Sequence, residues 1–281
     1  MNPEVAKTDR EFSVKGYLTL SEIPPGVVSD RSSVVVADIV RATTTINAVL
    51  ARGARAVQVV PKTYGIEVDN TPLRAGVPLI CAGEQGGEPV PGGVFSNSAL
   101  EVPQRVAGMH VRFYSTNSGS IINELTYQFV GTPTANLYLA SMFNVDALAS
   151  VIEDTGSEQL LVCAGGFYDR VSIEDAVAGG RLIKRLGLED AALDDGATTM
   201  LALADRFQDD QVLIDAVSTN RVGRTLRRFG RAHDIPAAIT GVGLDPHLAA
   251  DLRHTIGQLT WLSTNTPVFE RTTNTKRGKP K

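Results

Sequence analysis

Short apolar runs alternate along most of the chain with longer segments of helical periodicity. Runs with strand character lie at residues 33–39, 56–60, 78–82, 110–115, 136–140 and 159–163. Helical patterns lie at 42–52, 121–129, 145–153, 172–186 and most of 194–230. Strands that alternate with helices at this spacing form right-handed crossovers. The sequence therefore predicts an α/β fold with a largely parallel sheet and helices on both faces.

Local signals at the ends of these elements refine the prediction in a few places. Asn144 and Ser172 occupy expected helix N-caps, and Asp175, three residues after Ser172, resembles a capping box. The pattern at 235–262 is ambiguous, because ITGVGL is a candidate strand and HLAADLRHTI a candidate helix.

A stretch rich in glycine and proline at 83–98 interrupts the alternation. It is expected to be a loop, either a hinge between two lobes or an active-site loop. We divide the chain into a lead-in at 1–30, an α/β domain at 31–262 and a basic, flexible tail at 263–281.

Charge is unevenly distributed along the 281 residues, whose net charge is −4. The last twelve residues carry five basic side chains and one glutamate, which makes +4 and leaves about −8 for the rest. An acidic body argues against nucleic acid as the main partner. It suits a protein that binds a divalent cation through carboxylates.

Several features bear on location. No apolar run approaches the ~18–20 residues of a membrane span, and the first ten residues lead into no hydrophobic segment. Two cysteines, Cys81 and Cys163, each within an apolar run, favour a reducing compartment. We expect a cytoplasmic protein with no membrane partner, and a homodimer is left open.

Polar residues follow the predicted strands at their carboxyl ends, where open parallel sheets bind ligands. They include carboxylates, hydroxyls, an amide, a glycine and an arginine: Asp38, Arg41, Thr43, Glu84, Thr116, Asn117, Ser118, Gly119, Ser120, Glu174 and Asp175. Hard oxygen ligands beside a phosphate-sized anion site indicate Mg²⁺. The four histidines show no zinc-ligand spacing, and neither a P-loop nor a GxSxG elbow is present.

Each of these residues also has a structural interpretation. Asp38 lies within an apolar run and is either a metal ligand or catalytic group, or a helix cap that pairs with Arg41. Arg41 suits a phosphate or an ordinary ion pair. The segment STNSGS is an anion site or plain helix capping. Glu174 and Asp175 are metal ligands or favourable charges at a helix start.

Four segments occur in a fixed order: VVVADIVRATTTI, CAGEQGGEPVPGGVFSNSA, YSTNSGS and LLVCAGGFYDRVSIEDAVAGG. They resemble the signature segments of the 2-phosphosulfolactate phosphatase family, and the GRAHDI stretch near Asp234 also resembles a segment of that family. The order and approximate spacing hold from about residue 33 to residue 250. The chain is identified as a divergent member. The resemblance implies an α/β fold and Mg²⁺-dependent hydrolysis of a phosphate monoester on a small 2-hydroxy carboxylate.

The resemblance and the strand-end pattern together assign roles. Expected catalytic residues are Asp38, Arg41 and Glu84. Expected phosphate-binding residues are Arg41, Thr43, Asn97, Thr116, Asn117, Ser118, Gly119 and Ser120. Expected Mg²⁺ ligands are Asp38, Glu84, Glu174, Asp175 and Asp195. The expected partner is a small phosphorylated metabolite.

The chain departs from the family pattern at several positions. Gln85 stands in place of the arginine of the family's GER motif, and Ala99 in place of the proline of GNSP. Losing a fixed positive charge weakens recognition of a second anionic group, so an altered substrate is expected. Two alternatives stay open: a lyase or other enzyme on a phosphorylated or nucleotide-like substrate, and an inactive homologue that binds an anion.

Overall fold

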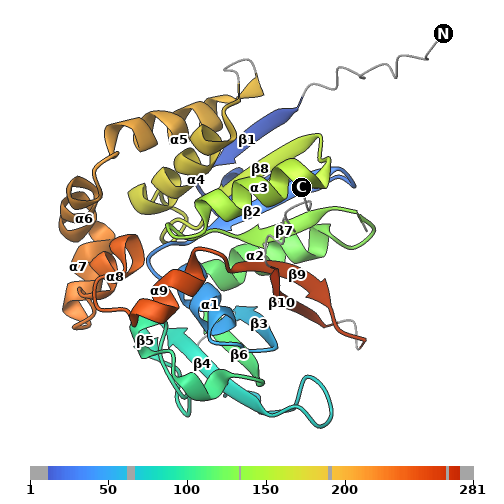
Figure 1. Cartoon of the computed structure of the whole chain (residues 1–281), viewed down its shortest axis with the longest axis vertical. Coiled ribbons are helices and arrows are strands. Elements are labelled where there is room, and N and C mark those ends of the chain that lie inside the picture. Colours follow the sequence, from blue (N-terminus) through green and yellow to red (C-terminus); the bar gives the residue numbers. More distant parts are fainter. Residues whose placement is uncertain (1–11, 62–66, 133, 189–191, 264–265, 273–281) are drawn as a thin grey trace, which may run out of the picture.

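The computed structural model describes residues 12–61, 67–132, 134–188, 192–263 and 266–272. Their strands form a ten-stranded sheet in the order β1-β8-β2-β7-β9-β10-β3-β6-β4-β5 (Figure 1). The strand bounds are β1 Ser13–Tyr17, β2 Ser32–Ala37, β3 Ala56–Pro61, β4 Leu79–Gln85, β5 Glu88–Pro89, β6 His110–Ser115, β7 Asn136–Leu139, β8 Gln159–Ala164, β9 Ile256–Trp261 and β10 Pro267–Thr272.

The sheet contains two parallel blocks, β1-β8-β2-β7 and β3-β6-β4. The hairpin β9–β10 lies between them (Figure 1). The three pairings between β7 and β3, namely β7–β9, β9–β10 and β10–β3, are all antiparallel. The strands of one parallel block are therefore antiparallel to the strands of the other. The prediction of a largely parallel sheet is confirmed, but the polar strand ends belong to two blocks rather than to one edge of a single parallel sheet.

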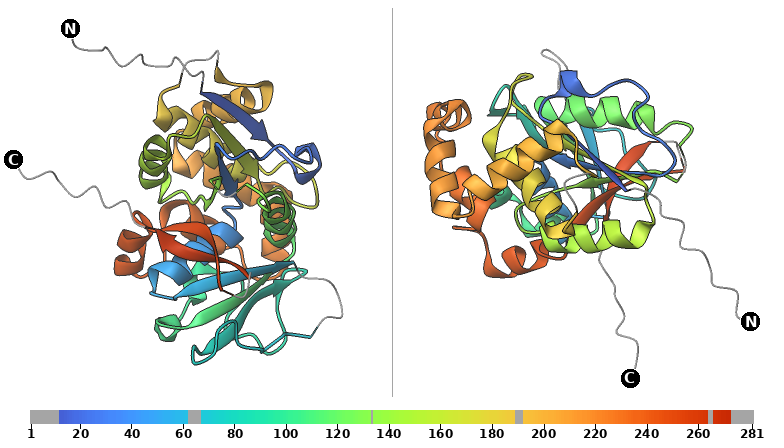
Figure 2. Two further views of the ribbon diagram at one scale, coloured as in Figure 1. Left: turned by 90° about the vertical axis from the view of Figure 1, so that its right-hand side faces the viewer. Right: turned by 90° about the horizontal axis from the view of Figure 1, so that it is seen from above.

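Helices follow most of the parallel strands and lie on both faces of the sheet (Figure 2). Their bounds are α1 Ala42–Ala51, α2 Asn117–Gln128, α3 Val145–Thr155, α4 Ile173–Leu186, α5 Asp195–Arg206, α6 Asp210–Thr219, α7 Arg221–Arg228, α8 Asp234–Thr240 and α9 Pro246–Leu252. Short 3-10 turns occur at Leu20–Glu22, Ala99–Glu101 and Gln104–Val106. In the described part of the chain, none of the helices is long and apolar enough to cross a bilayer.

Strand β2 illustrates how the core is divided. Val34 and Val36 belong to a cluster with apolar residues of α1 and α2. Val35 and Ala37 belong to a second cluster with residues of α3 and α4. Because side chains alternate along a strand, the two clusters cover opposite faces. Burial on both faces explains why this strand is a continuous apolar run rather than an alternating one.

The local predictions were confirmed in part. ITGVGL is not a strand, since α8 ends at Thr240 and Gly241 follows with φ +82°. Asn144 and Ser172 occupy the N-cap positions of α3 and α4, as predicted, but neither side chain makes a capping hydrogen bond. Asn144 instead bonds the loop backbone at Ser141, Leu139 and Thr255, which explains why an asparagine suits this position.

Four strands were not predicted: β1, β5, β9 and β10. β1 lies within the expected lead-in and pairs with β8 along its length. β9 was not predicted, and β10 lies within the expected flexible tail, so residues 267–272 are ordered in the sheet. The stretch at 83–98 is not all loop, because the C-terminal end of β4 and all of β5 lie in it. Its role as a hinge between lobes stays a prediction.

Candidate active site

A cavity of about 260 Å³ opens where the carboxyl ends of β2, β4 and β6 meet helix α7. Strands from both parallel blocks therefore contribute to one site. Six of the predicted site residues line it: Asp38, Arg41, Glu84, Asn97, Thr116 and Asn117.

Asp38 follows β2 on the turn into α1 and is 6 % exposed. One oxygen, Oδ2, accepts a hydrogen bond from the Ser118 hydroxyl. Burial, with the charge of Glu84, raises the pKa of the Asp38 carboxyl, while the bond from Ser118 opposes that rise. A Cβ on Gly165 would lie 2.6 Å from the Cβ of Asp38, so only glycine fits beside this side chain. The carboxylate is thus fixed at the cavity wall and is costly to ionise there without a cation.

Glu84 is held at the end of β4 by two backbone donors. Its Oε2 accepts the Gly87 N–H at 2.7 Å, and its Oε1 accepts the Thr116 N–H at 2.8 Å. Gly87 adopts φ +95°, and a Cβ there would lie 2.6 Å from the Phe229 ring. The glycine-rich sequence after Glu84 is therefore needed both for the turn and for the close approach of α7.

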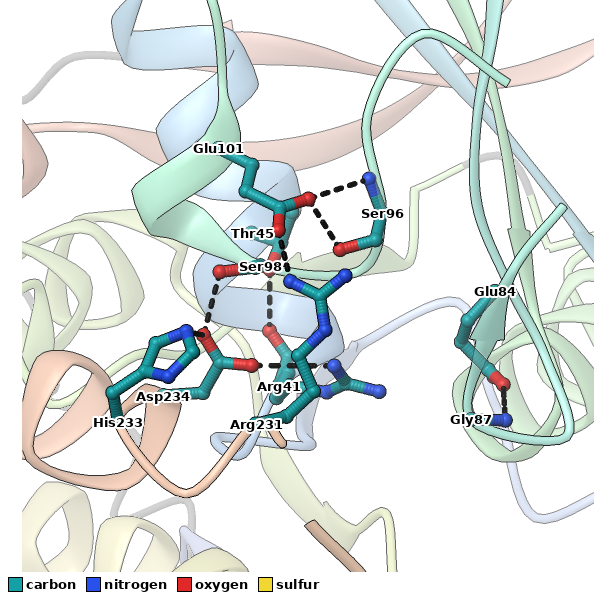
Figure 3. Close-up of polar contacts among 10 residues, drawn as sticks. All are labelled: Arg41, Thr45, Glu84, Gly87, Ser96, Ser98, Glu101, Arg231, His233 and Asp234. Atoms are coloured by element: carbon teal, nitrogen blue, oxygen red, sulfur yellow. Dashed lines mark hydrogen bonds and ion pairs between the residues drawn. The ribbon is translucent and has the colours of Figure 1, made fainter. Parts of the chain in front are cut away.

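Arg41 is buried and paired with a residue far away in the sequence. Its Nη1 lies 3.2 Å from Asp234 Oδ2, while the Ser98 hydroxyl donates to Asp234 Oδ1 at 2.5 Å (Figure 3). Asp234 is itself 3 % exposed. Arg41 also lines the cavity. Asp234 thus fixes the position of Arg41 and leaves it a cavity-facing surface.

Two amides complete the polar wall. Asn97 is buried, and its Oδ1 has no hydrogen-bond partner within the described residues. Asn117 Oδ1 accepts the N–H of Tyr168 at 3.4 Å. A buried polar atom without a partner is costly unless a ligand or water satisfies it. Asn97 is therefore available to a bound molecule.

The other predicted phosphate-binding residues do not line this cavity. Thr43 Oγ1 accepts the N–H of Asp38 at 3.1 Å, and Ser118 donates to its carboxylate. Gly119 allows α2 to approach β3, because a Cβ there would lie 2.7 Å from Pro61 Cα. Ser120 is exposed and bonds the Thr116 carbonyl. Thr43 and Ser118 therefore position Asp38. Gly119 and Ser120 instead have structural roles in helix α2.

Glu174 and Asp175 are buried at the start of α4 and do not line the cavity. Asp175 accepts the N–H groups of Ile39 at 2.8 Å and Gly166 at 3.0 Å, which ties the ends of β2 and β8 together. Burial, then the charges of Asp38 and Glu174, raise the Asp175 pKa well above its usual value. Burial raises the pKa of Glu174 to about 7, and its Oε2 has no partner among the described residues. Both carboxyls therefore lie in the protein interior and outside the cavity.

Glu174 makes a stability prediction possible. Its carboxyl binds a proton more tightly in the folded state than in the unfolded state, where the pKa is 4.5. Folding stability should therefore fall as pH rises from about 4.5 to 7, by roughly 3 kcal/mol once the group is ionised. Glu174→Gln should raise the thermal midpoint of the metal-free protein at pH 8 and much less at pH 4.5.

The matched control is Glu153→Gln, which alters an exposed glutamate on α3. Its thermal midpoint should follow that of the wild type at both pH values. A pH-independent difference between Glu174→Gln and wild type would contradict the assigned ionisation.

Asp195 does not join the other predicted ligands. It is exposed at the first position of α5 and does not line the cavity. In the described ranges, no group of three or more His, Cys, Asp or Glu side chains is arranged to hold a metal ion. The predicted set of five carboxylates is thus not brought together, and only Asp38 and Glu84 face the cavity.

Comparison with known proteins identifies the family of the chain. A family model described as 2-phosphosulpholactate phosphatase matches residues 17–242. The chain belongs to the 2-phosphosulfolactate phosphatase family. Curated relatives named probable 2-phosphosulfolactate phosphatase include those of Gloeobacter violaceus and Thermosynechococcus vestitus. The relative from Gloeobacter violaceus is 32 % identical, and the match covers 72 % of this chain and 80 % of the relative. The relative from Thermosynechococcus vestitus is 32 % identical, and the match covers 78 % of this chain and 88 % of the relative. A third relative, from Deinococcus radiodurans, is 31 % identical, and the match covers 73 % of this chain and 81 % of the relative.

The match confirms the family predicted from the four segments and, with it, the class of phosphoric monoester hydrolase. The matched residues include β2, β4, β6 and β8, whose ends form the cavity and its surroundings, and also α7. This 2-phosphosulfolactate phosphatase family member therefore has its cavity inside the region shared with the family.

Sequence reasoning missed several residues of the family member's cavity. Helix α7 contributes Thr225 and Arg228, Phe229 follows at the C-cap of α7, and the loop after β8 contributes Phe167 and Tyr168. Tyr168 has a positive φ of 51°, which is unusual for an aromatic residue. The amphipathic pattern of α7 was visible in the sequence, but nothing local indicates which surface a helix covers.

Proposed function

We propose that this chain is a Mg²⁺-dependent phosphatase that hydrolyses a phosphate monoester of a small metabolite. The observation that carries the proposal is the shared cavity of Asp38, Glu84 and Arg41, with the first turn of α2 beside them. Two carboxylates can hold a hard cation, and a guanidinium and backbone N–H groups can hold a phosphoryl group. Neighbouring charges of opposite sign suit a metal and a phosphate bound together.

The donor set fits Mg²⁺ by its chemistry. Mg²⁺ is commonly held by one or two carboxylates together with waters and substrate phosphate, rather than by a full protein cage. Asp38 and Glu84 supply two such carboxylates. Asp38 is buried with a raised pKa, so a cation would stabilise its ionised form. We assign these two residues as the ligands and leave Glu174, Asp175 and Asp195 out of the proposed set.

Bound Mg²⁺ would neutralise phosphoryl oxygens and acidify a water. Arg41, held by Asp234, would stabilise the negative charge that spreads over the equatorial oxygens during transfer. Asn97 and Asn117 would orient the substrate. Asp38 would act either as general base toward a water or as the nucleophile in a phosphoaspartyl route.

The expectation of an altered substrate depended on Gln85. That residue ends β4, pairs with Glu88 and does not line the cavity, whereas Glu84, Gly86 and Gly87 do. Because Gln85 does not line the cavity, the absence of an arginine at this position gives little support to the expected change of substrate. We propose a small phosphorylated metabolite as the partner, with no nucleic acid and no membrane, and a homodimer is left open. A cytoplasmic location is proposed from the two free, buried cysteines, Cys81 and Cys163.

The test is phosphate release from a panel of phosphate esters. With Mg²⁺ we expect turnover of at least one ester, and EDTA should lower it at least ~100-fold because the ionised carboxylates then lack their cation. Added Mg²⁺ should restore the rate. The Asp38→Asn variant, purified in parallel, controls for a contaminating phosphatase.

Full activity after exhaustive chelation would contradict the metal assignment alone. Failure to release phosphate from any ester would contradict the proposed function. Consumption of the ester with an organic product other than the alcohol would favour the lyase alternative.

A further inference from the structure

A second cavity, of about 330 Å³, adjoins the one described above. Three residues line both cavities, which therefore meet at the start of α2 and at the loop after β8: Thr116, Asn117 and Tyr168. The other lining residues of the second cavity are Leu20, Ser120, Ile121, Gly165 and Asp169. The proposed metal ligands and Arg41 line only the first cavity. The second cavity is thus additional space beside the reacting centre.

The lining of the second cavity is largely apolar. Leu20, in a 3-10 turn, and Ile121, on α2, are aliphatic. Tyr168 adds an aromatic side chain that is 59 % exposed. Among the described residues that line this cavity none is basic, whereas Asp169 is acidic. Such a lining suits an uncharged, apolar group and disfavours an anion.

Tyr168 is held in place where the two cavities meet. Its ring contacts the Phe167 ring edge to face, with the ring centroids 4.7 Å apart. Its N–H donates to Asn117 Oδ1 at 3.4 Å, and the next residue, Asp169, accepts the Ser21 N–H at 2.9 Å. These contacts fix the ring from both sides of its own backbone. A wall that is already ordered lowers the entropic cost of binding a ligand against it.

The backbone of this loop is strained. Tyr168 and Asp169 have φ values of 51° and 55°, in the left-handed region that favours glycine. Strain of this kind is concentrated at ligand-binding and active sites, where the surrounding structure enforces it. Two consecutive strained residues at the junction of two cavities therefore support a role for the Tyr168 ring in binding.

A phosphate ester at the proposed site has the second cavity within its reach. The first cavity must hold the cation, its waters and the phosphoryl group. Asn117 begins α2, beside the proposed phosphoryl site, and belongs to the wall that the two cavities share. The organic group bonded to that phosphoryl group can therefore extend past Asn117 and Tyr168 into the second cavity.

We propose that the second cavity binds the organic group of the phosphate ester, and that this group packs against the ring of Tyr168. The inference rests on the proposed function and deepens it. It names the substrate class as phosphate monoesters of an alcohol that carries an uncharged, apolar group of about the size of a ring. It assigns the recognition of that group to the loop after β8 and the 3-10 turn at Leu20–Glu22.

The test compares two esters that differ only in a phenyl ring, 2-phenylethyl phosphate and ethyl phosphate. In the wild type, kcat/KM should be roughly 10-fold higher for 2-phenylethyl phosphate. Tyr168→Ala should lower this ratio of kcat/KM values roughly 10-fold, mainly through KM, because the ring contact and its buried area are lost. Tyr168→Phe keeps the ring and should keep the ratio within about twofold of the wild type.

Leu20→Ser tests the same cavity from another element, because Leu20 lines the second cavity and not the first. It should lower the ratio roughly threefold, since less apolar area is lost than in Tyr168→Ala. The matched control is Tyr127→Ala, which removes an exposed tyrosine of α2 that lines neither of the two cavities. It should leave kcat/KM for both esters unchanged.

An unchanged ratio in Tyr168→Ala would overturn the inference. So would a ratio that falls in Phe229→Ala and not in Leu20→Ser, because Phe229 lines only the first cavity and the phenyl group would then bind there. Turnover by the wild type reports separately on the proposed function. Where the wild type hydrolyses neither ester, calorimetry with Mg²⁺ measures the binding of the same two esters. Equal affinities for the two would also overturn the inference.

Discussion

Replacing Asp38 with asparagine is expected to lower turnover by roughly 10³-fold or more. Asparagine keeps the shape and can still accept the hydrogen bond from Ser118, so the change removes the charge and little else. A ligand or nucleophile is a principal electrostatic element of a site, and its loss has effects of this size. The measurement is kcat and KM with saturating Mg²⁺ on the best ester of the panel.

The same variant should not be less stable without metal. The folded-state pKa of Asp38 is raised above its unfolded value of 3.8, so ionisation at neutral pH costs folding free energy. Asparagine removes that cost, and the thermal midpoint of the metal-free protein should stay or rise. Mg²⁺ should then raise the midpoint of the wild type and not that of the variant.

Asp195→Asn is the matched control for Asp38→Asn. Asp195 was predicted as a ligand by resemblance, but it is exposed on α5 and outside the cavity. Its replacement should leave both turnover and the Mg²⁺-dependent midpoint unchanged. Near-normal turnover in Asp38→Asn, together with a lower midpoint, would instead mean that Asp38 is a structural cap.

The parts of the site that could be predicted are those with a local signal. Asp38 lies within an apolar run, where an ionised group is expensive and so indicates a function, and Glu84 lies just beyond the end of a predicted strand in a glycine-rich turn. The parts that were missed depend on distant contacts. Arg41 and Asp234 are 193 residues apart, and no pattern near either residue indicates the pairing.

The fold shows the same limit. Buried runs such as 159–163 were predicted as strands, whereas β1 reads SVKGY, with lysine and glycine among its five residues. β1 is a strand because its backbone pairs with β8 and because Gly16 allows α5 to approach, since a Cβ there would lie 2.4 Å from Ala197 N. Such tertiary contacts override weak local propensity. The hairpin β9–β10 similarly joins two blocks whose opposite senses no local pattern specifies.

Asp234→Ala is expected to have the second large effect, on stability as well as activity. It removes the carboxylate that pairs with Arg41 and the acceptor of the Ser98 hydroxyl. Breaking a buried ion pair from one side leaves an uncompensated charge, and we expect a loss of about 3 kcal/mol of unfolding free energy. Asp234→Asn keeps one acceptor oxygen for Arg41, and its amide N–H can donate to the Ser98 hydroxyl instead of accepting from it. It should therefore lose less stability, but it no longer fixes Arg41 with a charge.

Activity separates positioning from a merely structural role. We expect kcat to fall roughly 100-fold in Asp234→Asn while most of the protein stays folded at the assay temperature, because a misplaced Arg41 no longer matches the transferring phosphoryl group. Arg41→Ala should cost at least as much. The double variant Arg41→Ala/Asp234→Asn should then be no slower than Arg41→Ala alone, since the acid acts only through the arginine. Additive losses in kcat would show instead that Asp234 contributes to catalysis independently of Arg41.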